Sequence, residues 1–336
     1  MPDSPVHCSI DLDAPGTQWG QLELPRSNNT SGWSHLYVPV VSIRGGDGPT
    51  ALVVGGVHGD EPEGQVAALR LARETREEDV LGQLIVVPCA SPDASRAYTR
   101  LWPSGANLNR SFPGRPDGTP DEQLADFFTR FLIPRAAVVV DMHSGGRSGL
   151  CPAWSEMHLV EDAAQRRAMV EAMLAWNTDY HFVYVDVAGT GLLVGEAERQ
   201  GKLVVSTELG GGGHVTAATH RVAWSGLVNV LRHTGVLAGE VVRRETPPTI
   251  VDATSADDYL LAPESGLWET FVDPGERVEP GQPLGRIHFL ERPDREPEVV
   301  HARGGGIVMV VRAIATTAQG DNVVVVGRQI SAEELG

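Results

Sequence analysis

The sequence of 336 residues has few cysteines, no long apolar run and a shortage of basic charge. Its three cysteines are an odd number without metal-ligand spacing, so we expect neither a disulfide framework nor a cysteine zinc site. No apolar stretch approaches the roughly 18 residues of a membrane span, and the N-terminus shows no basic and apolar signal segment. The sequence therefore predicts a cytoplasmic protein without a membrane partner.

The shortage of basic charge excludes a further class of partner. The chain carries 27 Lys and Arg residues against 44 Asp and Glu residues, a formal net charge of −17. Such a surface disfavours nucleic acid and anionic membranes, although a basic pocket for a small substrate can still exist inside it. The hydrophobic content of 41% is that of a globular protein, and the length allows one large domain or two unequal ones. The oligomeric state stays open, and a homo-oligomer is compatible with the sequence.

Apolar, strand-like runs alternate with helix-like stretches through the first two thirds of the chain. This alternation predicts an α/β sandwich with a largely parallel or mixed sheet. Residues 17–44 alternate polar and apolar side chains, which is typical of antiparallel edge strands. The expected strands cover residues 51–57, 84–88, 137–142, 181–187 and 202–207, and the expected helices cover 64–76, 121–131, 161–176 and 222–232.

The composition changes after about residue 240, where residues 243–248 read as a linker. The tail that follows reads as short strands between Gly/Pro turns, a pattern typical of a small β barrel or sandwich. We therefore expect an N-terminal β-strand extension at 1–44, an α/β domain at 45–240 and a C-terminal β domain at 247–336. Residues 262–285 resemble the barrel-sandwich hybrid of biotinyl and lipoyl domains, but the tail has no lysine to carry such a cofactor.

Two of the expected strands deliver residues that can bind a metal. The run at 51–57 leads into His58 and Glu61, and the run at 137–142 leads into His143. Functional residues gather at the carboxyl ends of strands in such sheets. Two imidazoles and one carboxylate leave a fourth tetrahedral position for water, as in catalytic zinc sites. Alone, Glu61 could equally stabilise the start of a helix.

Three further segments carry polar residues suited to catalysis. Asn109 and Arg110 stand side by side and can grip a carboxylate, and Arg100 can reach the same cavity. Glu208 ends a strand and can act there as a general base. The glycine run at 210–213 lacks the lysine of a phosphate loop, so we read it as a loop that gives access to the site.

Together these segments resemble the succinylglutamate desuccinylase/aspartoacylase family, a branch of the zinc carboxypeptidase fold. The shared motifs are H-G-D-E at 58–61, N-L-N-R-S-F-P-G at 107–114, D-M-H-S-G-G at 141–146 and T-E-L-G at 207–210. The resemblance covers about residues 45–235. It implies a mixed-sheet α/β/α sandwich with a small C-terminal all-β barrel-sandwich domain. Within the family, the chain looks most like deacylases that act on N-acetyl-diaminobutyrate.

The resemblance also implies one Zn²⁺ per chain and an N-acyl amino acid as substrate. Arg100 lies slightly farther upstream of Asn109 than in aspartoacylases, and residues 102–105 stand between them. The implied roles are metal ligation by His58, Glu61 and His143, general base catalysis by Glu208, carbonyl polarisation by Arg100, and α-carboxylate binding by Asn109 and Arg110.

We therefore expect a zinc-dependent amidohydrolase that removes a short acyl group from an N-acyl amino acid. One alternative is a metallocarboxypeptidase acting on small peptides, which needs the same metal, base and carboxylate clamp. Another is a non-catalytic binding protein that uses its tail as an interaction module. The acyl group, the amino acid side chain, and the roles of Arg147 and His214 stay open at this stage.

Overall fold

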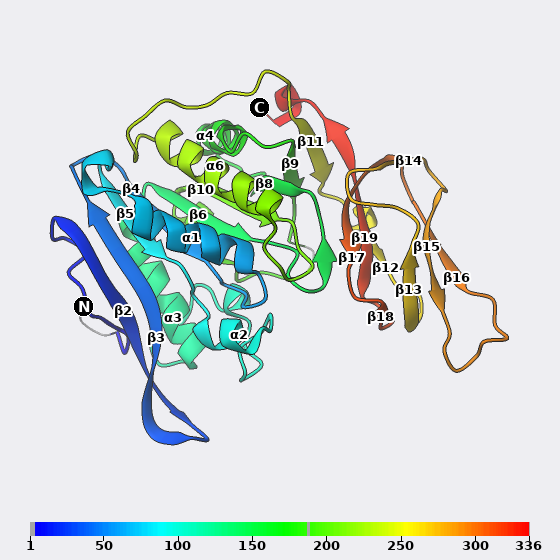
Figure 1. The fold of residues 1–336 in the computed structure, drawn as a ribbon, viewed down its shortest axis with the longest axis horizontal. Coiled ribbons are helices and arrows are strands. Elements are labelled where there is room, and N and C mark those ends of the chain that lie inside the picture. Colours follow the sequence, from blue (N-terminus) through cyan, green and yellow to red (C-terminus); the bar gives the residue numbers. More distant parts are fainter. Residues whose placement is uncertain (1–3, 187–188, 336) are drawn as a thin grey trace.

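A computed structural model describes residues 4–186 and 189–335, which form a mixed α/β fold. The described residues build one mixed sheet of 15 strands and a second, antiparallel sheet of four strands. The main path of the large sheet runs β1-β2-β3-β5-β4-β6-β10-β8-β9-β11-β19-β17-β14. The predicted α/β class is confirmed, and the large sheet is the frame on which the candidate site is built (Figure 1).

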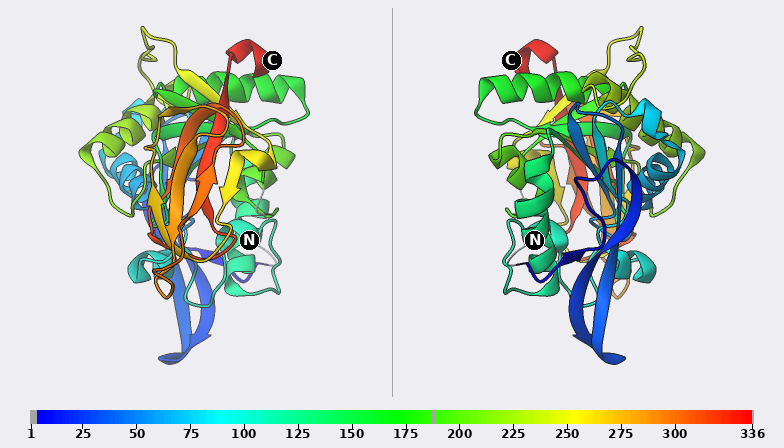
Figure 2. Two further views of the ribbon diagram at one scale, coloured as in Figure 1. Left: turned by 90° about the vertical axis from the view of Figure 1, so that its right-hand side faces the viewer. Right: turned by 90° about the vertical axis from the view of Figure 1, so that its left-hand side faces the viewer.

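A long hairpin forms the N-terminal end of this sheet. Strands β2 (Gly16–Asn28) and β3 (Ser31–Arg44) pair antiparallel along almost their whole length. The far end of the hairpin projects from the body in Figures 1 and 2. The sequence predicts two edge strands here, but β3 lies inside the sheet because its last residues also pair with β5 (Gln83–Val87). The short β1 (His7–Cys8) covers the outer edge of β2.

The centre of the sheet is parallel and buried on both faces. Strands β4 (Thr50–Gly55), β6 (Val138–His143) and β10 (Leu203–Leu209) run parallel, each beside the next. Their sequences are almost continuously apolar because helices cover both sides. The carboxyl ends of the three strands therefore meet at one edge of the sheet.

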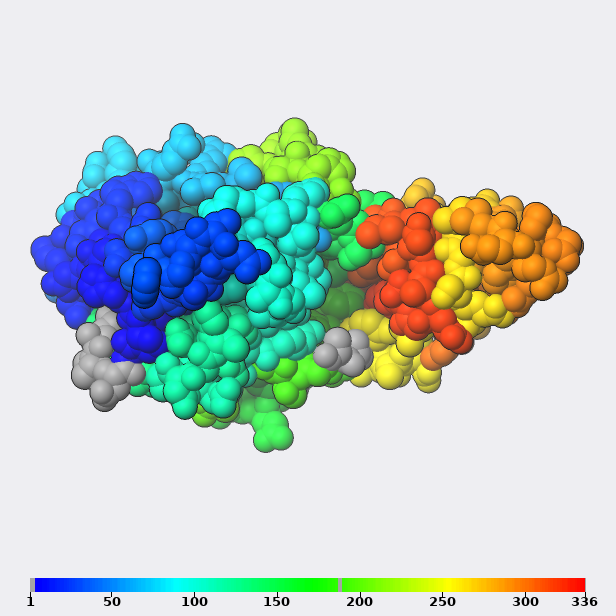
Figure 3. Space-filling model, turned by 90° about the horizontal axis from the view of Figure 1, so that it is seen from below, coloured from blue at the N-terminus to red at the C-terminus, as the bar shows by residue number. Residues whose placement is uncertain are grey.

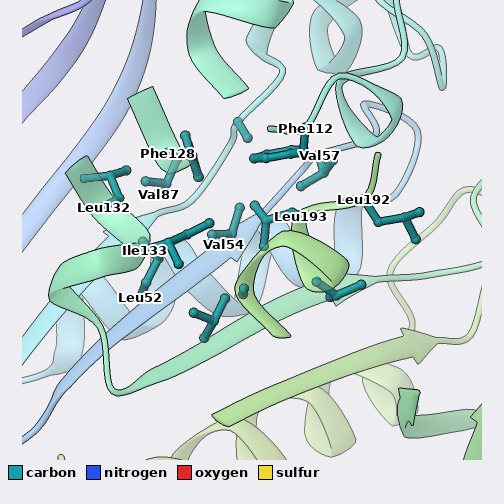
Figure 4. Packing of buried hydrophobic residues seen from close by; sticks show 14 of the residues in the cluster. Leu52, Val54, Val57, Val87, Phe112, Phe128, Leu132, Ile133, Leu192 and Leu193 are labelled. Atoms are coloured by element: carbon teal, nitrogen blue, oxygen red, sulfur yellow. The ribbon is translucent and has the colours of Figure 1, made fainter. Parts of the chain in front are cut away.

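Helices form a layer on each face of these strands. Helices α1 (Pro62–Glu74), α4 (Ala163–Ala175) and α6 (Ala217–His233) lie side by side on one face. Helices α3 (Pro120–Phe127) and α5 (Leu193–Arg199) cover the other. Successive side chains of a strand point to opposite faces, so β4 contributes to both cores. Figure 4 shows Leu52 and Val54 of β4 packed beside Phe128, Leu132 and Ile133, which follow α3.

Several elements differ from the sequence prediction. The sequence predicts one helix at 121–131. The structure has instead the shorter α3, a π-helical turn at Phe128–Leu132 and a 3₁₀ turn at Ile133–Arg135, which contains a proline. The strand expected at 181–187 ends at Tyr184, and Val187 lies outside the described residues. Besides the two-residue strands β1 and β7 (Gly149–Leu150), the sequence did not predict α2 (Pro92–Ala97), β8 (Ala153–His158) and α5.

The tail is built from short strands, as predicted, but it is not separate from the large sheet. Strand β11 (Thr249–Ala253) pairs parallel with β9 (Tyr180–Tyr184) and antiparallel with β19 (Asn322–Ile330). Figure 3 shows the tail at one end of an elongated molecule. Because the sheet continues past residues 44 and 247, the three-domain division stays a prediction.

The remaining tail strands are short. They are β12 (Tyr259–Leu261), β13 (Gly266–Thr270), β14 (Arg277–Val278), β15 (Pro283–His288), β16 (Glu298–His301), β17 (Gly306–Arg312) and β18 (Thr316–Thr317). Strand β7 (Gly149–Leu150) of the body pairs with β17.

Among the helices of the described residues, none has the length and apolar content needed to cross a membrane.

Candidate active site

The ends of β4 and β6 and the start of α1 meet at one point of the sheet edge. His143 is the last residue of β6, and His58 follows β4 after a short turn. Glu61 caps the start of α1, where Pro62 occupies the first helical position. Gly64 allows this approach, because a Cβ atom there would lie 2.6 Å from the Cβ of Met142. The fold thus brings together two imidazoles and one carboxylate that are distant in sequence.

The carboxylate of Glu61 lies between the two imidazoles. Its Oε1 is 2.8 Å from Nδ1 of His58, and its Oε2 is 2.7 Å from Nδ1 of His143. One ligand atom from each residue lies within 4.8 Å of the others, and all three residues are buried. Both distances are those of hydrogen bonds, and the same three side chains could instead hold a divalent cation. Two nitrogens and one oxygen are a donor set that fits a zinc ion.

The charges of the three residues depend on one another. Burial lowers the pKa of His58, whose neutral form is the one that binds metal. Burial opposes protonation of His143 too, but the carboxylates of Asp141 and Glu61 outweigh it and hold its pKa well above the usual range. Burial also opposes ionisation of Glu61, yet the two imidazoles hold the pKa of its carboxyl well below the usual range. A metal must therefore displace a proton from His143.

Hydrogen bonds on the far side of each imidazole fix its orientation. Nε2 of His143 lies 3.0 Å from Oδ2 of Asp141, and Nε2 of His58 lies 3.2 Å from Oδ1 of Asn107. With both Nε2 atoms occupied, the Nδ1 atoms point towards Glu61. Partners of this kind set the tautomer and raise the basicity of ligand histidines. Asp141 thus lies directly behind the imidazole of His143.

Glu208 lies on β10 directly opposite His143 of the neighbouring strand β6. Its Oε2 is buried and has no hydrogen-bond partner among the residues that the structure describes. Burial, together with the charges of Glu61 and Glu156, raises the pKa of Glu208 well above its usual range. A divalent cation nearby would oppose this shift and favour the carboxylate. Glu208 is therefore in place to hold a proton next to the metal-binding group.

Arg100 follows α2 and contacts Glu61 of the metal-binding group. Its Nη1 donates a hydrogen bond to Oε1 of Glu61 at 2.9 Å, and about half of its side chain (47%) stays exposed. A cavity with two lobes lies beside these residues, and Arg100 lines both lobes. The arginine can thus reach a substrate carbonyl bound beside the metal ligands, despite the longer segment that separates it from Asn109.

The two residues expected to hold a carboxylate differ in their surroundings. Arg110 lines the smaller lobe of the cavity, and burial and the charge of Arg100 lower its pKa. Asn109 is buried, and its Oδ1 accepts a hydrogen bond from the backbone N–H of Leu193 at 2.9 Å. Its Nδ2 lies 3.4 Å from Nε2 of His143. Asn109 therefore holds the start of α5 beside the metal-binding group and also lines the cavity.

The cavity has two connected lobes at the junction of body and tail. The smaller lobe, of about 170 Å³, contains His58, His143 and Arg110. The larger lobe, of about 440 Å³, extends to Arg312 and Asn322 of the tail. Five residues line both lobes: Arg100, Glu156, Tyr184, Glu208 and Tyr259.

Sequence analysis missed three of these shared residues, namely Glu156, Tyr184 and Tyr259. Glu156 lies on β8, a strand that was not predicted. The segment Ala153–His158 has neither an apolar run nor a strict alternation of apolar and polar residues, so no local signal marks that strand. No local pattern marks the tyrosines, because β9 and β12 bring them to the cavity from distant parts of the chain.

The glycine run packs against the loop that follows His143. Gly210, Gly211, Gly212 and Gly213 all have positive φ angles, which glycine adopts readily. A Cβ atom at Gly211 would lie 2.1 Å from the carbonyl oxygen of Gly149. The run thus lets the end of β10 approach the loop after β6.

The two residues with open roles lie beside the site. His214 is exposed, and its Nδ1 lies 3.2 Å from the carbonyl oxygen of Gly212. Arg147 stacks over the ring of Tyr98, with the guanidinium carbon 5.4 Å from the ring centroid, and its backbone N–H donates to Asp60. Neither residue lines the two lobes described above.

The chain is similar to several known proteins. Residues 47–234 match the model of the succinylglutamate desuccinylase/aspartoacylase catalytic domain. The chain is 38% identical to an N-alpha-acetyl-L-2,4-diaminobutyric acid deacetylase of Halomonas elongata, over 99% of this chain and 97% of the relative. It resembles a crystal structure of a succinylglutamate desuccinylase from Silicibacter sp. TM1040, with a TM-score of 0.93 and 39% identity over 98% of this chain and 100% of the other. It also resembles the product-bound ectoine utilization protein EutE (DoeB) of Ruegeria pomeroyi, with a TM-score of 0.93 and 40% identity over 97% and 99%.

Proposed function

Because the chain belongs to the succinylglutamate desuccinylase/aspartoacylase family, we propose that it is a zinc-dependent amidohydrolase acting on N-acyl amino acids. The proposed reaction removes a short acyl group, such as acetyl. The name of the Halomonas relative supports N-acetyl-diaminobutyrate as a substrate. The three cysteines are free, which fits a reducing compartment, and we propose the cytoplasm as the location.

One observation carries the proposal: the buried group of His58, Glu61 and His143 lies beside Glu208, which has an unpartnered carboxylate oxygen. The donor set fits one zinc ion. When bound there, zinc would supply an activated water and polarise the acyl carbonyl. A carboxylate held next to that position, without a hydrogen bond of its own, is suited to general base catalysis.

Side chains of the protein carry out proton transfer, stabilisation of the developing negative charge and substrate binding. Glu208 accepts the proton of the attacking water as the new C–O bond forms. Arg100 donates a hydrogen bond to the oxygen on which negative charge develops. Glu208 then returns the proton to the departing nitrogen as the C–N bond breaks, which releases the free acid and the amino acid. Arg110, with Asn109 beside it, would hold the α-carboxylate in the smaller lobe.

A metallocarboxypeptidase would need the same residues, so the substrate separates the two functions. We propose the deacylase because Tyr259, Arg312 and Asn322 of the tail line the cavity, and a tail at the entrance favours small substrates. The test is a panel of N-acetyl amino acids and dipeptides, assayed for released amine with and without a chelator. Chelator-sensitive release from the N-acetyl amino acids supports the proposal. Faster release from the dipeptides would establish the peptidase instead, and no release from any substrate would favour a binding protein.

A further inference from the structure

The cavity wall contains an acidic side chain that the proposed reaction does not use. Glu156 lines both lobes, and only 6% of its surface is exposed. Its carboxylate accepts hydrogen bonds from Nε1 of Trp154 at 2.8 Å and from Oγ of Ser206 at 3.3 Å. Burying a carboxylate is costly unless a cation balances it. Two neutral donors balance it only in part.

In the part of the chain that the structure describes, 4–186 and 189–335, no cationic side chain forms an ion pair with Glu156. Burial raises the pKa of its carboxyl and outweighs the charges of His143 and His158, which lower it. Arg100 pairs with Glu61, and Arg312 of the larger lobe pairs with Asp321 at 2.9 Å. A buried acid in a ligand cavity, without a cation of its own, is a site where a ligand can bring the positive charge.

Strand register fixes where that charge would lie. Ser206 of β10 is opposite Glu156 of β8, and Glu208 is opposite Trp154. Residues two apart on a strand share a face, so Glu208 and Glu156 are diagonal neighbours on the same face, with backbones about 7–8 Å apart. A substrate whose amide lies at Glu208 can therefore reach Glu156 with a side chain of two carbons and an amine.

Aromatic rings complete the surroundings of the carboxylate. Phe182 of β9 lies opposite Glu156 in the sheet, and its ring centroid is 5.0 Å from that of Trp154. Tyr184 and Tyr259 line the same two lobes. Aromatic faces attract ammonium groups and keep water away from the ion pair. The faces of these rings would therefore favour a cation beside Glu156.

We propose that Glu156 binds the side-chain ammonium of a short diamino acid and thereby determines substrate specificity. This inference rests on the proposed deacylase function and narrows its substrate to N-acyl amino acids with a cationic side chain. Glu156 holds the amine while the N-acyl group lies at the metal-binding group. An N-acyl aspartate would place its carboxylate against Glu156 and would be rejected.

The test compares two substrates of the same shape. Nα-acetyl-2,4-diaminobutyrate ends in an ammonium group, and Nα-acetylnorvaline has a methyl group in its place. In Glu156→Gln, the amide oxygen can still accept from Nε1 of Trp154 and the amide NH2 can donate to Oγ of Ser206, but the charge is gone. We expect kcat/KM for the diaminobutyrate substrate to fall roughly 30-fold or more, the loss typical of removing one partner of a buried charge pair. For the norvaline substrate we expect a change within about threefold, which also shows that the variant is folded.

A matched control and a binding measurement secure the result. Asp252 lies on the neighbouring strand β11, pairs with Arg328 and does not line the lobes, so Asp252→Asn should leave the substrate preference unchanged. Calorimetry with free 2,4-diaminobutyrate and norvaline should show the same preference in the wild type and its loss in Glu156→Gln. Equal losses on both substrates, or an unchanged preference, would overturn the role of Glu156. If the wild type hydrolyses neither substrate, the proposed function fails, while calorimetry still decides whether Glu156 binds the amine.

Discussion

At the scale of single residues, the site consists of three candidate metal ligands and the contacts that surround them. His58, Glu61 and His143 could be predicted because each follows an apolar run or opens a helix, and strand ends meet at one edge of a sheet. The hydrogen bond by which Asn109 holds the start of α5 could not be predicted, because its partner, the backbone N–H of Leu193, lies 84 residues away in sequence. Local sequence thus identifies candidate metal ligands better than it identifies the residues that hold their surroundings in place.

Replacing Glu208 by Gln tests the proposed general base. The amide keeps the size of the side chain but cannot accept the proton, so turnover should fall by about 10²–10⁴-fold. Metal content should stay at the wild-type level, because Glu208 is not in the metal-binding group. Steady-state assays and elemental analysis measure the two effects, with Glu298→Gln on tail strand β16 as the control. Turnover near the wild-type rate would remove Glu208 from the mechanism.

His158 should make the stability of the fold depend on pH. Burial opposes its protonation, but hydrogen bonds to Asp186 and Glu198 outweigh this and raise its pKa to about 10. The unfolded value is about 6.5, so the contribution is complete below pH 6.5 and is lost as the pH rises towards 10. At pH 6, His158→Gln should lower the free energy of unfolding by on the order of 3 kcal/mol relative to wild type.

Urea unfolding of both proteins at pH 6, 8 and 9.5 measures this difference. The gap between wild type and His158→Gln should shrink steadily across the three values. A gap that stays constant or grows with pH would mean that the two carboxylates do not hold a protonated imidazole.

At the scale of elements, α1 must approach β6 closely if Glu61 is to reach His143. Gly64→Ala should disturb this approach, because the added Cβ would lie 2.6 Å from Met142. We expect a loss of about 1–3 kcal/mol in stability and weaker metal binding, although alanine favours helices in general. Gly195→Ala is the matched control, since a Cβ atom there has nothing within 4 Å and Gly195 also lies in a helix. Equal effects of the two substitutions on metal binding would contradict this account.

Strand β8, which the sequence did not predict, has polar residues on both of its buried faces. Strand β8 carries Ser155 and Glu156, which are buried only because neighbouring strands and the tail surround them. A short segment of this composition lacks the apolar run that marks β4 or β6. The parallel centre of the sheet could therefore be predicted, whereas the strand that shapes the larger lobe of the cavity could not.

At the scale of the whole molecule, one sheet connects the N-terminal hairpin, the catalytic region and the tail. The pairing of β11 with β9 places tail residues such as Tyr259 and Arg312 at the cavity, so the tail contributes to the site as well as to the fold. The net charge of −17 does not predict which charges line the cavity, where Arg100 and Arg110 lie among acidic side chains. Charge balance over the whole chain and charge in the site are separate properties.

The central claim is that His58, Glu61 and His143 hold one catalytic zinc ion. The most direct measurement is the metal content of the purified chain, followed together with its deacylase rate through chelation and zinc re-addition. The account predicts close to one zinc per chain, loss of metal and activity together on chelation, and recovery of both when zinc is restored. A chain that binds no first-row metal after metal-replete expression, or one that keeps its full rate after the metal is removed, would contradict the account.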